Sequence, residues 1–150
     1  DFANAKPEEI KSIIRPCGLY KVKSQNIIDM CKIIDSQYNG DIPDDMDKLT
    51  SLPGIGRKTA NLILAEVYSK PAIIVDTHFL RITSRLGLHN LKDPFKIELF
   101  MKNIIPPEES VKFCHRTVQH GREICNAKKP LCEKCCLKKY CDYYFEHQVT

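Results

Sequence analysis

Lys58 has the clearest chemical potential in this chain, because of the residues that precede it. It follows Gly54-Ile55-Gly56, and two glycines so placed predict a tight turn between a short helix over 46–52 and a helix that begins at Arg57. Backbone amides of such a turn suit a phosphate. The helix dipole also favours the neutral, nucleophilic form of an amine in the first turn. The stretch 52–61 therefore predicts a phosphate-binding turn whose lysine is a solvated charge, a phosphate contact or a nucleophile.

Asp76 lies at a second informative place. Asp76-Thr77 is a start signal for a helix that should run to Arg85 and end at Gly87. The apolar, β-branched segment 71–75 precedes it, but nothing nearby would pair with it as a strand. We therefore expect 71–75 to be a buried extended crossing and Asp76 to cap the helix that follows.

The eight cysteines are clustered, with five of them between residues 125 and 141. Four follow the spacing C-x6-C-x2-C-x5-C: Cys125, Cys132, Cys135 and Cys141. Both zinc and a cubane iron–sulfur cluster accept four thiolates. Structural zinc sites more often use two tight pairs, so a single tight pair favours the cluster without settling the choice. Cys136 has no place in the pattern, and we expect it not to be a ligand.

The positive charge is concentrated near the C-terminus. The net charge is only +4, but residues 112–139 carry eight basic and two acidic side chains, an excess of six. This distribution indicates a polyanionic partner, although a merely solvated basic face would look the same. The loop 126–131 lies between two cysteines and carries Lys128 and Lys129. If a metal centre fixes its ends, the loop would make a good phosphate contact.

Helix signals dominate the rest of the chain. Start signals occur at Pro7, Ser24, Asp45, Asp93 and Pro107, and end signals at Gly18, Asn39-Gly40 and Gly121. The first helix should bury Ile10, Ile13 and Ile14. No convincing strand pair appears, so the pattern predicts an all-α fold. The length suits one domain or two small ones.

The sequence shows no apolar run long enough to cross a bilayer and no secretory signal. We therefore expect a soluble intracellular protein of the cytoplasm or nucleoid, with no membrane partner. Without secretion, a metal centre is a better interpretation of the cysteine cluster than disulfides.

Taken together, the motifs resemble the endonuclease III family, within the helix-hairpin-helix DNA glycosylase/AP lyase superfamily. The resemblance is carried by 52–61, by Val75-Asp76-Thr77-His78 with Arg81, by His120-Gly121-Arg122 and by the four-cysteine spacing. It covers essentially the whole chain, with the motifs in the family's order and separation.

The resemblance implies two helical domains. Residues 1–70 would be part of a helical barrel that carries the helix-hairpin-helix, and 71–150 would hold a [4Fe-4S] cluster through the four cysteines. The family normally has several dozen residues before the point that matches Asp1, including a glutamine-bearing segment that fills the gap left by a flipped base. The chain would lack those N-terminal helices.

The resemblance also implies base-excision repair by a bifunctional DNA glycosylase/AP lyase that acts on oxidised pyrimidines such as thymine glycol. Lys58 would form a Schiff base that leads to β-elimination 3′ to the lesion, and Asp76 would stabilise positive charge. Damaged double-stranded DNA would be the partner of a monomer, with no small-molecule substrate. The implied DNA contacts are Leu52, Gly54, Gly56, Arg57, Thr59, His78, Lys128 and Lys129, although helix-end packing is an equal possibility for His78.

Two other interpretations stay open. One is a non-catalytic helix-hairpin-helix and metal fragment that only binds DNA, and the other is a zinc-stabilised interaction domain. Lys58, followed eighteen positions later by Asp76, argues against both, because a binding module needs neither residue at its place.

Overall fold

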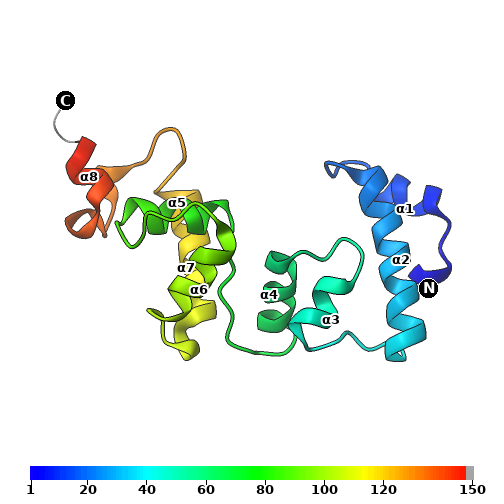
Figure 1. The fold of residues 1–150 in the computed structure, drawn as a ribbon. Helices are drawn as coiled ribbons and strands as arrows, with labels where there is room; N and C mark the ends of the chain where they lie inside the picture. The colour runs from blue at the N-terminus through cyan, green and yellow to red at the C-terminus, as the bar shows by residue number, and fades with distance from the viewer. Residues whose placement is uncertain (148–150) are drawn as a thin grey trace. The chain divides into compact units, whose positions relative to one another are not determined.

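The computed structural model describes residues 1–147, and within that range every regular element is helical (Figure 1). This confirms the all-α fold class. The chain divides into two compact units, Asp1–Tyr68 and Ser69–Thr150, which we call unit 1 and unit 2. Among the described residues, no helix combines the length and the apolar character that a membrane crossing requires.

Unit 1 consists of short helices around one long one. The elements are η1 (Phe2–Asn4), α1 (Pro7–Ile13), α2 (Tyr20–Tyr38), α3 (Met46–Ser51) and α4 (Arg57–Glu66). Asn39 and Gly40 adopt left-handed conformations, with φ of 53° and 86°, and close α2 as the sequence indicates. Asp45 caps α3, because its Oδ1 accepts the amide hydrogens of Asp47 and Lys48 at 3.0 Å each.

The start of α2 differs from the expectation that Ser24 caps it. Ser24 lies inside the helix, is fully buried and donates its hydroxyl hydrogen to the Lys21 carbonyl at 2.8 Å. The helix begins instead after Leu19, whose backbone adopts the left-handed conformation, with φ of 58°. Serine satisfies its hydroxyl on a nearby helix carbonyl as readily as on a helix end, so its local chemistry did not mark the boundary.

The core of unit 1 fixes the turn between α3 and α4. Its centre is formed by Leu49, Leu52, Ala60 and Leu64, none more than 9% exposed. Met30, Ile33, Ile34 and Tyr38 of α2 pack against this centre. The Tyr68 hydroxyl also donates to the Ile42 carbonyl, which ties the chain after α4 to the loop before α3.

Unit 2 contains the remaining elements. They are α5 (Thr77–Arg85), α6 (Pro94–Lys102), α7 (Pro107–Glu123), η2 (Cys132–Lys134), η3 (Lys138–Tyr140) and α8 (Asp142–His147). Figure 1 shows α5 and α7 in contact within this unit. The segment before α5 is extended and buried, with Ala72 and Ile73 each 1% exposed, which confirms the expected crossing.

Gly121 does not end α7, as the sequence suggested, but lies inside it. A Cβ atom at this position would lie 2.6 Å from Nδ1 of His78 and 3.0 Å from Cδ1 of Ile82, both on α5. The glycine therefore serves close packing of α5 on α7, and the helix continues to Glu123.

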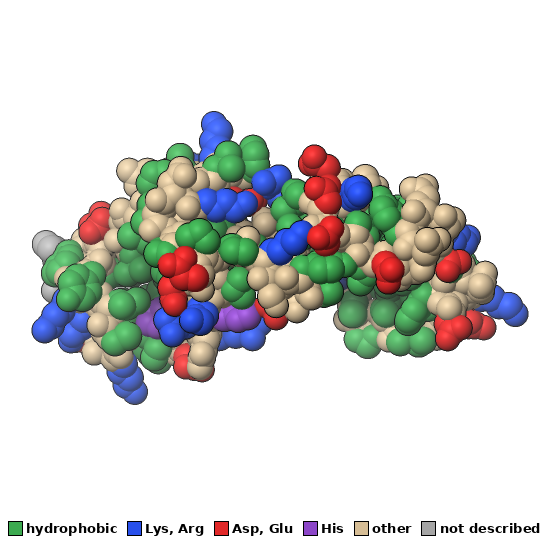
Figure 2. Space-filling model, turned by 90° about the horizontal axis from the view of Figure 1, so that it is seen from below, with side chains coloured by type: hydrophobic (Ala, Val, Ile, Leu, Met, Phe, Trp, Pro, Cys, Tyr) green, Lys and Arg blue, Asp and Glu red, His purple; other side chains and the backbone are tan. Residues whose placement is uncertain are grey.

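Hydrophobic side chains reach the surface of both units, as the green atoms of Figure 2 show on the face seen from below. The large exposed side chains include Val22 in unit 1 and Leu99 in unit 2.

Ile13 was expected to share the buried face of Ile10, but Ile13 is 72% exposed and Ile10 only 4%. That part of the predicted α1 face is wrong, because α1 meets its neighbours through a narrow stripe.

His89 forms a buried hydrogen-bonded link in unit 2. Its Nδ1 accepts the Leu91 amide hydrogen at 3.2 Å, and its Nε2 lies 2.9 Å from Oγ1 of Thr83. The Thr83 hydroxyl donates to the Phe79 carbonyl at 2.7 Å. The neutral ring must therefore carry its hydrogen on Nε2. Burial lowers the pKa of His89 below its ordinary value.

We expect this histidine to make the protein less stable as the pH falls from about 7 to about 5. The unfolded chain takes up a proton near pH 6.5, whereas the folded ring resists it, so acid favours the unfolded state. The contribution is at most about 1.4 kcal/mol per pH unit. Urea denaturation at several pH values measures it. His89→Gln should flatten the pH dependence, and the control His115→Gln, at an exposed site on α7, should not. An equal slope in both variants would contradict this account.

Candidate functional site

The turn between α3 and α4 presents free backbone amides. Gly56 is the N-cap of α4 and has no side chain to cap the helix, so its first amides are available to an anion. Gly54 has φ of 78°, and a Cβ atom there would lie 2.9 Å from both Cβ and Nδ2 of Asn26 on α2. Glycine is thus required at position 54 by backbone conformation and by close approach.

Lys58 is the second residue of α4, and its side chain is exposed. Ala60 and Asn61, which follow it, are buried at 0% and 2% exposure and anchor the helix. No hydrogen bond or ion pair within residues 1–147 holds the Lys58 ammonium group. A lysine on an anchored helix start with an unengaged amine is positioned to meet a bound anion or an electrophile beside it.

The other residues of unit 1 that were predicted to contact DNA differ in how exposed they are to solvent. Gly54 and Gly56 are exposed, and Arg57 and Thr59 are half-buried. Leu52 is only 3% exposed and belongs to the core. Its side chain is therefore unavailable for the predicted DNA contact, and only its backbone could take part.

Asp76 is the N-cap of α5, as the sequence indicates. Its Oδ1 accepts the amide hydrogen of Phe79 at 2.7 Å, and within residues 1–147 no hydrogen bond occupies its other carboxylate oxygen. The side chain is half-buried. A capping bond thus fixes the carboxylate while leaving one oxygen for a ligand. Asp76 belongs to unit 2 and Lys58 to unit 1.

His78 packs within unit 2. Its Nδ1 lies 3.1 Å from Nη2 of Arg81, and its ring lies against Gly121 of α7. The ring is half-buried. These contacts give His78 a packing role, while its contact with DNA stays a prediction.

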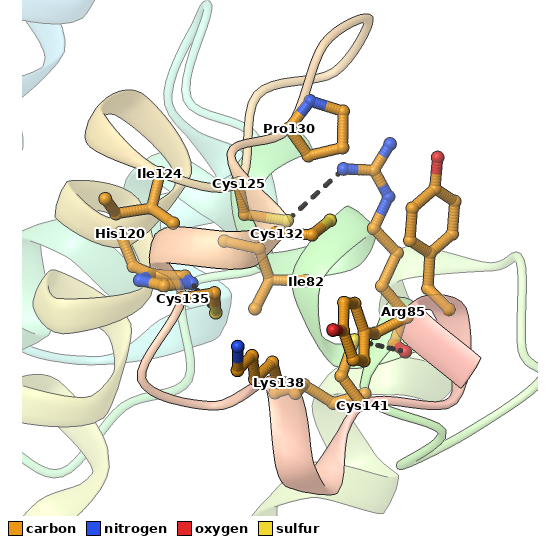
Figure 3. A pocket seen from close by; sticks show the side chains of 13 residues that line it. Ile82, Arg85, His120, Ile124, Cys125, Pro130, Cys132, Cys135, Lys138 and Cys141 are labelled. Atoms are coloured by element: carbon orange, nitrogen blue, oxygen red, sulfur yellow. Dashed lines mark hydrogen bonds between the residues drawn. The ribbon is translucent and has the colours of Figure 1, made fainter. Parts of the chain in front are cut away.

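The four cysteines of the spacing pattern line one cavity in unit 2 (Figure 3). Cys125 follows α7, Cys132 begins η2, Cys135 follows η2, and Cys141 follows η3. None is in a disulfide. Cys136 is exposed and lines a separate groove. The structure therefore gathers the four thiols of the spacing pattern and leaves the fifth outside.

The electrostatics of this cavity suit a cationic centre. Burial raises the pKa of Cys132, and the neighbouring Cys125 and Cys141 raise it further. Burial also raises the pKa of Cys135. Four thiolates so close would repel one another, so a positive centre is needed to hold them deprotonated. Across residues 1–147, no three histidine, cysteine or acidic side chains converge on the spacing of a single metal ion. Four thiolates are a donor set that both zinc and a cubane iron–sulfur cluster accept.

Arg85 of α5 holds the start of the cysteine segment. Its Nη1 donates to Sγ of Cys125 at 3.2 Å and to the Asn126 carbonyl at 2.8 Å, and its Nη2 donates to the Ala127 carbonyl at 2.9 Å. Figure 3 shows the bond to Cys125. The guanidinium also lies 4.3 Å from the centre of the Tyr143 ring. One side chain thus joins a predicted ligand, the basic loop and α8.

Arg81, one turn before Arg85, contacts the same segment. Its Nε and Nη2 donate to the Cys125 carbonyl at 3.1 and 2.8 Å, and Nη2 also donates to the Gly121 carbonyl at 3.1 Å. The helix that Asp76 caps is therefore bonded directly to the segment that carries Cys125.

The basic loop 126–131 is fixed at its base. The Leu131 amide donates to the Ile124 carbonyl at 2.9 Å, and Arg85 holds the carbonyls at the loop's other end. Lys128 and Lys129 are both exposed. The loop therefore projects two lysines from a closed base, as expected for a phosphate contact.

We expect Arg85→Met to reduce the free energy of unfolding by about 2 kcal/mol, because three hydrogen-bond acceptors lose their charged donor. Urea denaturation of the protein as isolated measures the change. The control Arg116→Met removes an arginine whose side chain is 76% exposed and whose ion pair with Glu109 is long, at 4.0 Å. Its loss should lower the free energy of unfolding by less than about 0.5 kcal/mol. Equal losses in the two variants would show that Arg85 does not brace the segment.

Sequence reasoning missed Arg85 and Leu19. The spacing of Arg81 and Arg85 was a usable signal, since residues four apart share one face of a helix. Leu19 offered no such signal. Only the structure reveals that it is 78% exposed and held in a left-handed conformation, which is uncommon for a leucine.

Comparisons with known proteins bear on the family of this chain. Residues 1–107 match the family described as HhH-GPD superfamily base excision DNA repair protein. Endonuclease III of Thermotoga maritima is 39% identical over 144 residues, which are 96% of this chain and 68% of that protein. The chain spans about two thirds of the length of the curated relatives it matches.

Two solved structures share the fold. One is a non-covalent complex of endonuclease III with DNA, with a TM-score of 0.93 and 37% identity, covering 99% of this chain and 70% of that one. The other is a trapped covalent intermediate of endonuclease III with DNA, with the same TM-score and identity, covering 98% of this chain and 70% of that one. The protein belongs to the HhH-GPD superfamily of base excision DNA repair proteins, as a member of the endonuclease III family.

Proposed function

We propose that this protein removes damaged bases from double-stranded DNA as a DNA glycosylase and then cleaves the strand as an AP lyase. The observation that carries the proposal is Lys58, an exposed and unengaged amine in the first turn of α4, directly behind the glycine turn. The similarity to a trapped covalent intermediate of endonuclease III with DNA supports a covalent step. Oxidised pyrimidines of the thymine glycol type are the proposed lesions, and the cytoplasm or nucleoid is the proposed location.

The reaction requires the target nucleotide to leave the base stack, because C1′ is inaccessible in an intact duplex. The lone pair of neutral Lys58 Nζ forms a bond to C1′, and the glycosidic bond breaks with its electrons leaving on the base, which takes up a proton. The sugar ring opens to a protonated Schiff base. Loss of a C2′ proton then expels the 3′ phosphate by β-elimination, and hydrolysis frees the lysine.

Asp76 is proposed to stabilise the positive charge that develops on the sugar as the base departs. The geometry of unit 2 supports this role, because the capping bond from Phe79 fixes one carboxylate oxygen and leaves the other unengaged. A carboxylate held in this way needs no reorganisation during the reaction.

DNA binding is proposed to use the backbone amides of the glycine turn, with Arg57, Thr59 and the exposed Lys128 and Lys129 as further phosphate contacts. Leu19 would add an apolar wedge of the kind that enters a base stack, because it is exposed and fixed at the start of α2. We further propose that the protein acts as a monomer.

We propose that Cys125, Cys132, Cys135 and Cys141 hold a [4Fe-4S] cluster. The cavity that all four share supports a single centre, and a spacing with only one tight pair favours the cluster over zinc. When bound, the cluster supplies a four-point cross-link that orders residues 125–141. Arg85 and the basic loop would then keep the positions described above.

Incubation with a duplex that contains one thymine glycol tests the proposal. A bifunctional enzyme releases the modified base and leaves a 3′ unsaturated aldehyde at the break. A protein that binds this duplex but releases no base would be the non-catalytic DNA-binding fragment instead. Yellow-brown protein with iron and acid-labile sulfide supports the cluster, whereas colourless protein with zinc contradicts it.

A further inference from the structure

Cys114 is a buried thiol that the proposed chemistry does not use. It lies in the middle of α7 and is 2% exposed. Its Sγ accepts the amide hydrogen of Ile74 at 3.2 Å and lies 4.0 Å from the Ala72 carbonyl, to which the thiol donates. Both partners belong to the extended crossing that leads into Asp76.

The thiol is unsuited to react itself. Burial raises the pKa of Cys114 to about 11, and the charge of nearby Asp76 adds to the rise. A protonated, enclosed thiol is neither a nucleophile nor a metal ligand. The thiol instead serves as a buried hydrogen-bonding group that accepts from the Ile74 amide and donates to the Ala72 carbonyl.

Phe113, the residue beside Cys114, contacts the helix that follows Asp76. Phe113 packs edge-on against Phe79, with ring centres 5.8 Å apart and planes at 75°. Phe79 is fully buried, and its amide donates the hydrogen bond that the Asp76 carboxylate accepts as the cap of α5. Two adjacent residues of α7 therefore fix the backbone two positions before Asp76 and the side chain three positions after it.

The buried amide of Ile74 needs a hydrogen-bond acceptor, and the Cys114 thiol provides it. Ile74 is 7% exposed, and a buried amide needs a partner. The crossing forms no strand, so a ladder of backbone hydrogen bonds cannot supply one. Serine at position 114 could accept and donate in the same way, whereas alanine or valine could do neither.

We propose that Cys114 is a positioning residue for Asp76, because it holds the extended backbone that presents this carboxylate. The proposal rests on the proposed function, in which Asp76 stabilises charge on the sugar. Loss of the thiol should let the crossing shift, and a shift of about 1 Å at a reacting group is enough to slow a reaction by as much as about 100-fold.

Single-turnover excision of thymine glycol from a duplex tests the role, at a temperature where every variant is folded. Cys114→Ala should slow base release by about 10- to 100-fold, with DNA affinity unchanged. Cys114→Val, which fills the space without hydrogen bonding, should be equally slow. Cys114→Ser should restore the rate to within about threefold of wild type. Full activity in Cys114→Val would overturn the proposal, since packing alone would then suffice.

A double-mutant cycle with Asp76→Asn shows whether the effect passes through Asp76. If it does, adding Cys114→Ala to Asp76→Asn should cause no further loss of rate. Multiplied losses in the double variant would overturn the positioning role. An inactive wild type would instead overturn the proposed function, so the two failures are distinguishable.

Discussion

Lys58→Gln is expected to lower the single-turnover rate of base excision by about 10⁴-fold or more. A carboxamide nitrogen has no available lone pair, so the bond to C1′ cannot form. Glutamine is a good helix former, and Lys58 makes no hydrogen bond or ion pair within residues 1–147, so α4 and the glycine turn should persist. DNA affinity should fall by no more than about tenfold, the effect of one lost charge. Gel separation of cleaved strands measures the rate.

Two controls separate nucleophilicity from charge. Lys58→Arg keeps the charge but not the nucleophile, and it should be as inactive as Lys58→Gln. Arg57→Gln removes a charge from the neighbouring position on α4, and it should weaken DNA binding but retain the rate at saturating protein. Excision by Lys58→Gln within about tenfold of wild type would exclude lysine as the nucleophile.

Cys132→Ser is expected to have the largest effect on stability. Because the binding free energy of a structural metal centre is folding free energy, losing one of four thiolates should lower the stability of the loaded protein by about 4 kcal/mol or more. In this variant, the backbone amides of residues 125–141 should exchange their hydrogens with solvent faster than in wild type. The iron and sulfide contents of the protein should fall together.

Cys136→Ser provides the matched control, one residue from the proposed ligand Cys135. Cys136 is exposed and outside the four-thiol cavity, so its replacement should leave iron content and thermal stability unchanged. If Cys136→Ser lost iron while Cys132→Ser retained it, the assignment of ligands would be wrong.

Most helix starts could be predicted because their signals are local. Asp45, Asp76 and Asp93 each cap a helix through their own side chain, and Pro107 begins α7. A residue that satisfies amides two or three positions away carries its structural role in the sequence.

The helix boundaries that were predicted wrongly involve residues whose role is to pack against another part of the fold. Ser24 resembles a cap but lies buried inside α2, and Gly121 resembles a helix end but admits the side chains of α5. Serine and glycine suit both settings, so only the packed partner distinguishes them.

The candidate site divides in the same way. Lys58 and the four cysteines could be proposed as candidates from their spacing and from the resemblance to the family. The spacing of Arg81 and Arg85 indicates a shared helix face but not what that face contacts, because Cys125 lies 40 residues from Arg85, as Ile74 does from Cys114. Such contacts depend on how α5 and α7 pack, which no local pattern specifies.

Borohydride trapping tests the central claim most directly. Wild-type protein, a duplex with thymine glycol or an abasic site, and borohydride should give one covalent adduct, because reduction fixes the Schiff base as a stable amine. Peptide mass analysis should place the sugar on Lys58, and Lys58→Gln should give no adduct. The absence of a wild-type adduct, or an adduct on another amine, would contradict the account.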